Sequence, residues 1–190
     1  MNQSPRRVIL AITGASGAIL GIRTLELLKE ASIETHLVIS RAARQTITSE
    51  TDWVISDVEA LATVNYDPQD IGAQLASGSF ATDGMLVIPC SIKTLSGIAN
   101  SYTDNLVVRS ADVSLKEGRR LILVVRETPL HPGHLRLMQL AAEAGAVILP
   151  PIPTFYGGPK TVEDLVTNLA GRILLRMGIE NEHYPRWDGN

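Results

Sequence analysis

Polar side chains suited to binding phosphate or moving protons follow the apolar runs of this sequence. Residues 13–16 bring a glycine and two hydroxyls after the first run, Ser40 follows the second, and residues 90–91 follow the third. An adjacent cation and carboxylate stand at 126–127, and Tyr156 lies after the last run. Hydroxyls, backbone donors and cations suit a phosphorylated ligand, and a carboxylate beside them suits acid–base chemistry.

The apolar runs alternate with segments of helical periodicity, which predicts an α/β fold: a single doubly wound, mostly parallel sheet with helices on both faces. We expect strands at 8–12, 35–39, 85–88, 121–125 and 147–149, and helices at 42–49, 105–115, 135–144 and 162–177. Residues 55–78 are less regular, and 73–80 are expected to form a mobile surface loop. In such a Rossmann- or flavodoxin-like sheet, ligands bind beyond the carboxyl ends of the strands, where the polar residues lie.

The turn after the first strand carries Gly14, Gly17 and Gly21. Small residues let backbone N–H groups approach a ligand beside the positive end of the next helix. The spacing is not G-x-G-x-x-G, and the second strand ends in Ser40 and Arg41 rather than an acidic ribose ligand, so nicotinamide binding is disfavoured. An anionic or flavin-like cofactor is expected, and a turn that only packs helix on strand is the alternative.

Length, composition and charge limit the number of domains and the kinds of partner that this chain can have. A chain of 190 residues with 45% hydrophobic residues is expected to form one domain over 1–190, with a frayed lead-in at 1–7 and a tail at 178–190. The net charge of −3 argues against a nucleic-acid partner. No apolar run approaches the roughly 20 residues of a membrane span, and no signal peptide is recognisable, so a cytoplasmic protein is expected.

Several of the polar residues have simpler structural explanations. Ser91 and Thr94 can cap and line a helix. Cys90 is flanked by apolar residues, as is typical of a buried side chain rather than a nucleophile. The adjacent charges at 126–127 are different, because they follow a buried strand directly and need partners.

The histidines and the single cysteine do not form a metal site in the sequence. His36 lies in a strand and is expected to be structural, and one cysteine excludes an internal disulfide. His131 and His134 have an i, i+3 spacing, but no third ligand accompanies them. No metal is expected.

Five motifs together carry a family resemblance. They are Thr-Gly-Ala-Ser-Gly at 13–17, Ser-Glu-Thr-Asp at 49–52, Pro-Cys-Ser-Ile-Lys-Thr-Leu-Ser-Gly at 89–97, Ala-Asp-Val-x-Leu-Lys-Glu at 111–117 and Val-Arg-Glu-Thr-Pro-Leu-His at 125–131. In this order, and over residues 8–187, the sequence closely resembles the UbiX-type flavin prenyltransferases.

The resemblance implies an activity that composition does not show. Enzymes of this type join the dimethylallyl group of dimethylallyl phosphate to N5 and C6 of reduced FMN, without a metal. The product, prenylated FMN, serves a UbiD-type decarboxylase, often in ubiquinone biosynthesis. Members of the family assemble as homo-oligomers, typically dodecamers, with sites built between subunits.

The resemblance also implies roles for individual residues. Glu127 matches the acid that assists phosphate departure, Ser16 lies near the reacting N5 edge, and Glu50 is a polar member of the same site. The positions that match FMN contacts are Gly14, Ala15, Ser16, Ser40, Ser91, Ile92, Lys93, Thr94 and Arg126. The positions that match contacts to the dimethylallyl phosphate are Arg109, Lys116, Tyr156 and Arg172, with Trp187 near the prenyl pocket.

Two other functions are weighed against this one. A flavin-dependent cysteine-type decarboxylase would carry a Pro-x-Met-Asn-type motif with a catalytic histidine, and neither is found in the sequence. A non-catalytic FMN carrier would not need the second set of phosphate-binding residues. The preference for mono- or diphosphate stays open, as does the effect of Gly157 and Gly158, which can loosen the loop that positions Tyr156.

Overall fold

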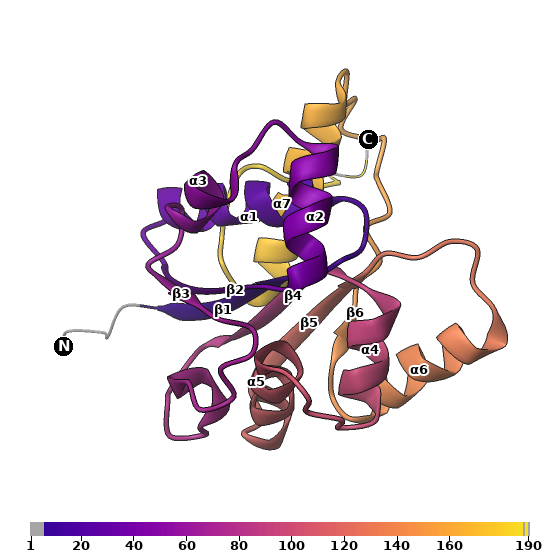
Figure 1. Ribbon diagram of the computed structural model, residues 1–190. Helices are drawn as coiled ribbons and strands as arrows, with labels where there is room; N and C mark the ends of the chain where they lie inside the picture. The colour runs from indigo at the N-terminus through magenta and orange to yellow at the C-terminus, as the bar shows by residue number, and fades with distance from the viewer. Residues whose placement is uncertain (1–5, 188, 190) are drawn as a thin grey trace.

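The computed structural model describes residues 6–187 and residue 189. Its centre is a six-stranded sheet in which every pair of neighbouring strands is parallel, with the order β3-β2-β1-β4-β5-β6 (Figure 1). The strands are β1 (Arg7–Ile12), β2 (Glu34–Ile39), β3 (Val64–Tyr66), β4 (Gly84–Cys90), β5 (Arg120–Val125) and β6 (Val147–Ile148). The predicted doubly wound α/β class is confirmed.

Helices cover both faces of the sheet (Figure 1). On one face lie α1 (Ala18–Glu30), α2 (Arg41–Glu50), α3 (Ile55–Glu59) and α7 (Val162–Met177). On the other face lie the short 3-10 helix η1 (Gln74–Ala76) and the helices α4 (Ile92–Ala99), α5 (Leu106–Lys116) and α6 (Pro132–Glu143). None of the helices in the described part of the chain is both long and apolar enough to cross a membrane.

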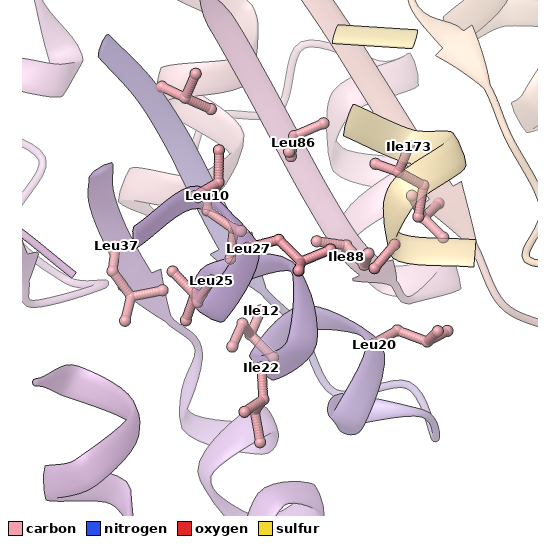
Figure 2. Packing of buried hydrophobic residues seen from close by; sticks show 14 of the residues in the cluster. Leu10, Ile12, Leu20, Ile22, Leu25, Leu27, Leu37, Leu86, Ile88 and Ile173 are labelled. Atoms are coloured by element: carbon pink, nitrogen blue, oxygen red, sulfur yellow. The ribbon is translucent and has the colours of Figure 1, made fainter. Parts of the chain in front are cut away.

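The alternation of side chains along β1 explains why two cores form. Leu10 and Ile12 point to the α1 face, where Figure 2 shows them near Ile22 and Leu25 of α1. Ala11 points to the opposite face, into the second core. Because successive strand residues alternate between faces, an unbroken apolar run is what a strand covered on both sides requires. Each fully buried aliphatic side chain contributes about 1.5–3 kcal/mol.

The strand order creates a crevice beyond the carboxyl ends of the two central strands, β1 and β4, which are themselves paired. The chain runs from β1 outward through β2 to β3, then returns to the other side of β1 and continues through β4, β5 and β6. The helix after β1 covers one face, whereas the helix after β4 covers the other. The crevice therefore opens beyond the carboxyl ends of β1 and β4, where ligands of such sheets bind.

The N-terminal lead-in is shorter than expected. Residues 1–5 of the predicted frayed segment lie outside the described residues, but Arg7 is the first residue of β1. The Arg7 backbone N–H donates to Asp83 at 2.6 Å, and its guanidinium binds Glu34 at 2.7 Å. These partners are distant in sequence, so the local polarity of the segment gave no sign of the order at Arg7.

The stretch at 73–80, predicted to form a mobile surface loop, contains a short helix and contacts a later segment of the chain. The irregular stretch contains α3, the edge strand β3 and η1. Leu75 is buried, and the Arg119 guanidinium donates to the carbonyls of Gly78 and Phe80. Small polar residues such as those at 77–79 suggested mobility, whereas a cation about 40 positions later holds the segment in place.

Helix α6 begins earlier than the predicted residue 135. Pro132 occupies its first turn, and the His131 ring accepts a hydrogen bond from the Gly133 N–H as the N-cap. Proline is well suited to the first turn, because the N–H that it lacks has no intrahelical acceptor there. His134 therefore lies in the helix rather than in a loop.

Gly21 tests the close packing of α1 on β4. A Cβ at this position would lie 2.5 Å from the Ile88 carbonyl oxygen, so Gly21→Ala must push the helix from the sheet. We expect a loss of about 1–3 kcal/mol in the free energy of unfolding, measured by denaturant titration. Gly72→Ala is the control, since its Cβ would meet only the Asp70 carboxylate at 3.4 Å. Equal stability of both variants would contradict close contact between α1 and β4.

Candidate active site

A cleft of about 760 Å³ opens at the switch point of the sheet. The loops after β1, β2 and β4 contribute residues from the predicted cofactor set: Gly14, Ser40, Ser91, Lys93 and Thr94. This volume lies within the usual range of small-molecule sites. The structure therefore brings together residues that are up to 80 positions apart in the chain.

Two helix N-termini border the cleft. The Ser40 hydroxyl accepts a hydrogen bond from the Ala43 N–H at 3.1 Å and caps α2. The Ser91 hydroxyl accepts one from the Thr94 N–H at 3.3 Å and caps α4. Capping, the structural explanation for Ser91, is thus confirmed, and the same residues line the cleft. The remaining first-turn N–H groups and the helix dipoles favour an anion there.

Arg41 and Lys93 place positive charge on the lining of the cleft. Both side chains are exposed, and neither has an ion-pair partner among the described residues. Free cations beside helix N-termini suit a phosphate group. Arg41 was not among the predicted site residues, although its position directly after the second strand was a usable signal.

The glycine turn after β1 is held at both ends. A Cβ on Gly14 would overlap the Ala42 side chain in the first turn of α2, so a glycine is required there. At the other end, the Gly17 N–H donates to the Glu50 carboxylate at 2.7 Å, and Gly17 has a positive φ of 95°. Ser16 is half-buried between these contacts. Glu50 thus contacts the loop that carries Ser16.

One wall of the cleft was not predicted. Gln69 comes from the connection after β3, while Tyr102 and Asn105 come from the connection between α4 and α5. The two connections are joined because the Leu106 N–H donates to the Pro68 carbonyl at 2.8 Å. Polar loop residues of this kind carry no motif, and only their tertiary contact identifies them.

Four predicted FMN contacts, Ala15, Ser16, Ile92 and Arg126, do not line the cleft in a single chain. Ala15 is buried in the turn, and Ile92 begins α4 but packs partly against the core. Arg126 is exposed at the end of β5, as is Glu127, whose carboxylate accepts a hydrogen bond from the Thr128 N–H at 3.0 Å. The predicted partners of this charged pair are not found: within residues 6–187, neither side chain has an ion-pair partner.

A second hollow, of about 420 Å³, gathers Tyr156, Arg172 and Trp187. The Tyr156 hydroxyl donates to the Tyr184 hydroxyl, and this bond raises the pKa of Tyr156. The Arg172 guanidinium lies 5.3 Å from the centre of the Tyr184 ring, and Tyr156 and Trp187 meet edge to face. Tyr184 organises this group but was missed, because the tail has no periodic pattern.

Gly157 lets the C-terminal tail pack closely against the loop that carries Tyr156. A Cβ at Gly157 would overlap the ring of Pro185, which follows Tyr184. The glycine therefore permits the close approach that brings Tyr184 to Tyr156.

The other two predicted phosphate ligands lie elsewhere. Arg109 and Lys116 belong to α5, on the opposite face of the sheet from α7 and Arg172 (Figure 1). Arg109 donates to the Ala76 carbonyl at 3.2 Å, and the Lys116 ammonium pairs with Glu117 at 2.8 Å. One chain thus does not bring together the four predicted phosphate ligands.

Cys90 and His36 have the structural roles expected of them. Cys90 is fully buried, and burial raises the pKa of its thiol far above the ordinary value. His36 is buried between the Tyr66 hydroxyl at 2.8 Å and the Glu34 carboxylate at 2.9 Å. Within the described residues, no group of three His, Cys, Asp or Glu side chains is placed to hold a metal ion.

Comparison with known proteins agrees with the resemblance seen in the motifs. The model of the Flavoprotein family matches residues 1–174. The flavin prenyltransferase UbiX of Escherichia coli K12 is 54% identical over 187 residues, covering 97% of this chain and 99% of the relative. The chain belongs to the UbiX-type flavin prenyltransferases.

Solved structures of UbiX-type proteins share the fold described above. AnUbiX (PadA1), crystallised with FMN and dimethylallyl pyrophosphate, has a TM-score of 0.96 and 48% identity, covering 98% of this chain and 99% of that one. A dodecameric FMN-dependent UbiX-like decarboxylase from Escherichia coli O157:H7 has a TM-score of 0.94 and 48% identity. The match covers 96% of this chain and 100% of that one.

Burial of Cys90 predicts that this UbiX-type protein resists alkylation. The thiolate is the reactive form, and here the sulfur is both inaccessible and held protonated. We expect no iodoacetamide adduct after an hour at pH 8 in the native state, and one adduct after unfolding in guanidinium, both read by intact mass. Rapid labelling of the native protein would show that β4 opens at the cleft.

Proposed function

We propose that this flavin prenyltransferase joins the dimethylallyl group of dimethylallyl phosphate to N5 and C6 of reduced FMN. The observation that carries the proposal is the anion-binding cleft at the switch point, in a chain 54% identical to a flavin prenyltransferase over nearly its full length. A solved relative that was crystallised with FMN and dimethylallyl pyrophosphate supports the pairing of these two ligands.

The residues of the cleft fit FMN. Gly14 lines the cleft and lets the first turn of α2 pack against the turn after β1, the capped N-termini of α2 and α4 supply backbone donors, and Lys93 supplies charge. We assign to FMN the predicted set of Gly14, Ala15, Ser16, Ser40, Ser91, Ile92, Lys93, Thr94 and Arg126. When bound and reduced, the flavin supplies an electron-rich ring for attack on an allylic carbon.

The second substrate requires residues from more than one subunit. Arg109 and Lys116 lie on one face of the sheet, while Tyr156 and Arg172 lie on the other, so one chain cannot place all four on a single phosphate. A related protein was crystallised as a dodecamer. We propose a homo-dodecamer in which neighbouring subunits complete each site.

The proposed reaction requires heterolysis of the allylic C–O bond of dimethylallyl phosphate. Cationic and phenolic donors stabilise the charge that develops on the leaving phosphate. Glu127 is assigned as the acid that gives a proton to the departing phosphate. We assign Ser16 to the side of the flavin that would react, and Trp187 to the exclusion of water from the five-carbon group.

The product is proposed to serve a UbiD-type decarboxylase, in ubiquinone biosynthesis or aromatic-acid metabolism. A carrier that only delivers FMN, and a cysteine-type decarboxylase, are disfavoured by the identity to a prenyltransferase over nearly the full length of both chains. The direct assay is anaerobic: protein, reduced FMN and dimethylallyl phosphate are combined, and the flavin is analysed by mass. Protein-dependent gain of one five-carbon unit supports the proposal, whereas unchanged FMN, with the diphosphate also tried, contradicts it.

Removing the acid at Glu127 tests its role in phosphate departure. We expect Glu127→Gln to lower kcat by about 10²–10⁴-fold, since an amide cannot give up a proton to the leaving group. FMN affinity should stay the same, measured by flavin fluorescence. Glu143→Gln, another exposed carboxyl, is the matched control and should retain full activity. Normal turnover by Glu127→Gln would overturn the assignment.

Mixed oligomers test whether one site draws on two subunits. Lys116→Ala and Arg172→Ala should each lose activity by more than about 100-fold. When the two variants are unfolded and reassembled together in equal amounts, we expect about one quarter of the sites to hold both residues, because each comes from a separate, randomly chosen subunit.

Reassembly of each variant alone gives the baseline for this experiment. Sites contained in one chain would never recover both residues, so a mixture no more active than its components would contradict assembly from two subunits.

A further inference from the structure

We propose that Thr13 is a positioning residue for the FMN site, whose hydroxyl joins the two strand ends that border the cleft. The inference goes beyond the proposed function and rests on it only for the identity of the ligand. Thr13 is 1% exposed and does not line the cleft, so any effect on the ligand must act through its neighbours.

The pairing of β1 with β4 ends just before Thr13. The registered pairs run from Val8 with Gly84 to Ala11 with Val87. Beyond this point no further residue pair is registered between the two strands, and the helices that follow them cover opposite faces of the sheet. The strand ends at the crevice need another connection if the cleft is to have a defined shape.

Thr13 provides that connection with three hydrogen bonds. Its N–H and its hydroxyl both donate to the Pro89 carbonyl, at 3.2 and 2.7 Å. The same hydroxyl oxygen accepts from the Ser91 N–H at 2.8 Å. The Thr13 hydroxyl oxygen thus accepts the Ser91 N–H, beyond the last registered pair between β1 and β4.

The Ser91 contact matters because Ser91 is the N-cap of α4. Its hydroxyl accepts from the Thr94 N–H, and its carbonyl accepts from the Leu95 N–H at 2.8 Å. Fixing the Ser91 backbone therefore fixes the first turn of α4, whose free N–H groups and Lys93 face the cleft.

The preceding residue connects the third loop to the same point. The Ile12 carbonyl accepts from the Ser40 N–H at 3.0 Å, and Ser40 caps α2. Residues 12–13 therefore hold both helix N-termini at a set distance from the glycine turn. Loss of the Thr13 hydroxyl releases one of these two attachments and leaves the Ser91 N–H without its acceptor.

Thr13→Val tests the inference, because it keeps the shape of the side chain and removes the hydroxyl. We expect the Kd for oxidised FMN, measured by fluorescence quenching well below the melting temperature, to rise about tenfold. Thr13→Ser retains the hydroxyl and should bind FMN as the wild type does, even if its melting temperature falls. This rescue separates the hydrogen bonds from the packing of the methyl group.

Thr24→Val is the matched control. Thr24 is fully buried, and its hydroxyl donates to the Leu20 carbonyl at 2.7 Å within α1, away from the cleft. This variant should lower the melting temperature of the apoprotein and leave the Kd for FMN unchanged. If Thr13→Val also lowered the melting temperature and left the Kd for FMN unchanged, Thr13 would be merely structural. That result would overturn the inference.

The remaining outcomes are also decisive. If Thr13→Val does not fold, Thr13→Cys, which retains a weak hydrogen-bonding group, should show an intermediate Kd. If Thr13→Ser lost as much affinity for FMN as Thr13→Val or Thr13→Cys, the proposed role of the hydroxyl would be overturned. Wild-type protein that fails to bind FMN would overturn the proposed function itself, an outcome distinct from unchanged binding by the Thr13 variants.

Discussion

The divergence of the chain after the neighbouring strands β1 and β4 is the constraint on which the rest of the structure depends. Because α1 leaves over one face of the sheet and α4 over the other, neither crossover covers the crevice beyond the strand ends. Backbone N–H groups of the first turns of α2 and α4 remain at this crevice without intrahelical acceptors. These N–H groups and the helix dipoles favour an anionic ligand at the strand ends.

Short side chains make the crevice usable as a binding site. Gly14 lets the first turn of α2 approach the β1 loop, since any Cβ would overlap Ala42. The hydroxyls of Ser40 and Ser91 each satisfy one backbone donor of a helix while lining the cleft. Larger residues at these positions would fill the space that the strand order opens. The same residues therefore serve folding and ligand binding, and neither role excludes the other.

The thickness of the sheet sets a second constraint. Arg109 and Lys116 lie on the face opposite to Tyr156 and Arg172, and a sheet with a helix layer on each side holds these groups apart. Charge stabilisation of a leaving phosphate needs its donors within hydrogen-bonding distance. The proposed reaction therefore depends on quaternary structure, whereas the cleft at the switch point is already formed in one chain.

The sequence by itself determined the α/β class, the strands β1, β2, β4, β5 and β6, the glycine turn and the family, because apolar runs, turn residues and motifs are local patterns. It did not reveal β3, the anchoring of 73–80 by Arg119, the role of Tyr184 or the bonds of Thr13. Each of these depends on a partner about 30 or more positions away in the chain. A hydroxyl or guanidinium looks the same in the sequence whether it faces water or a distant carbonyl, and only the tertiary structure decides which.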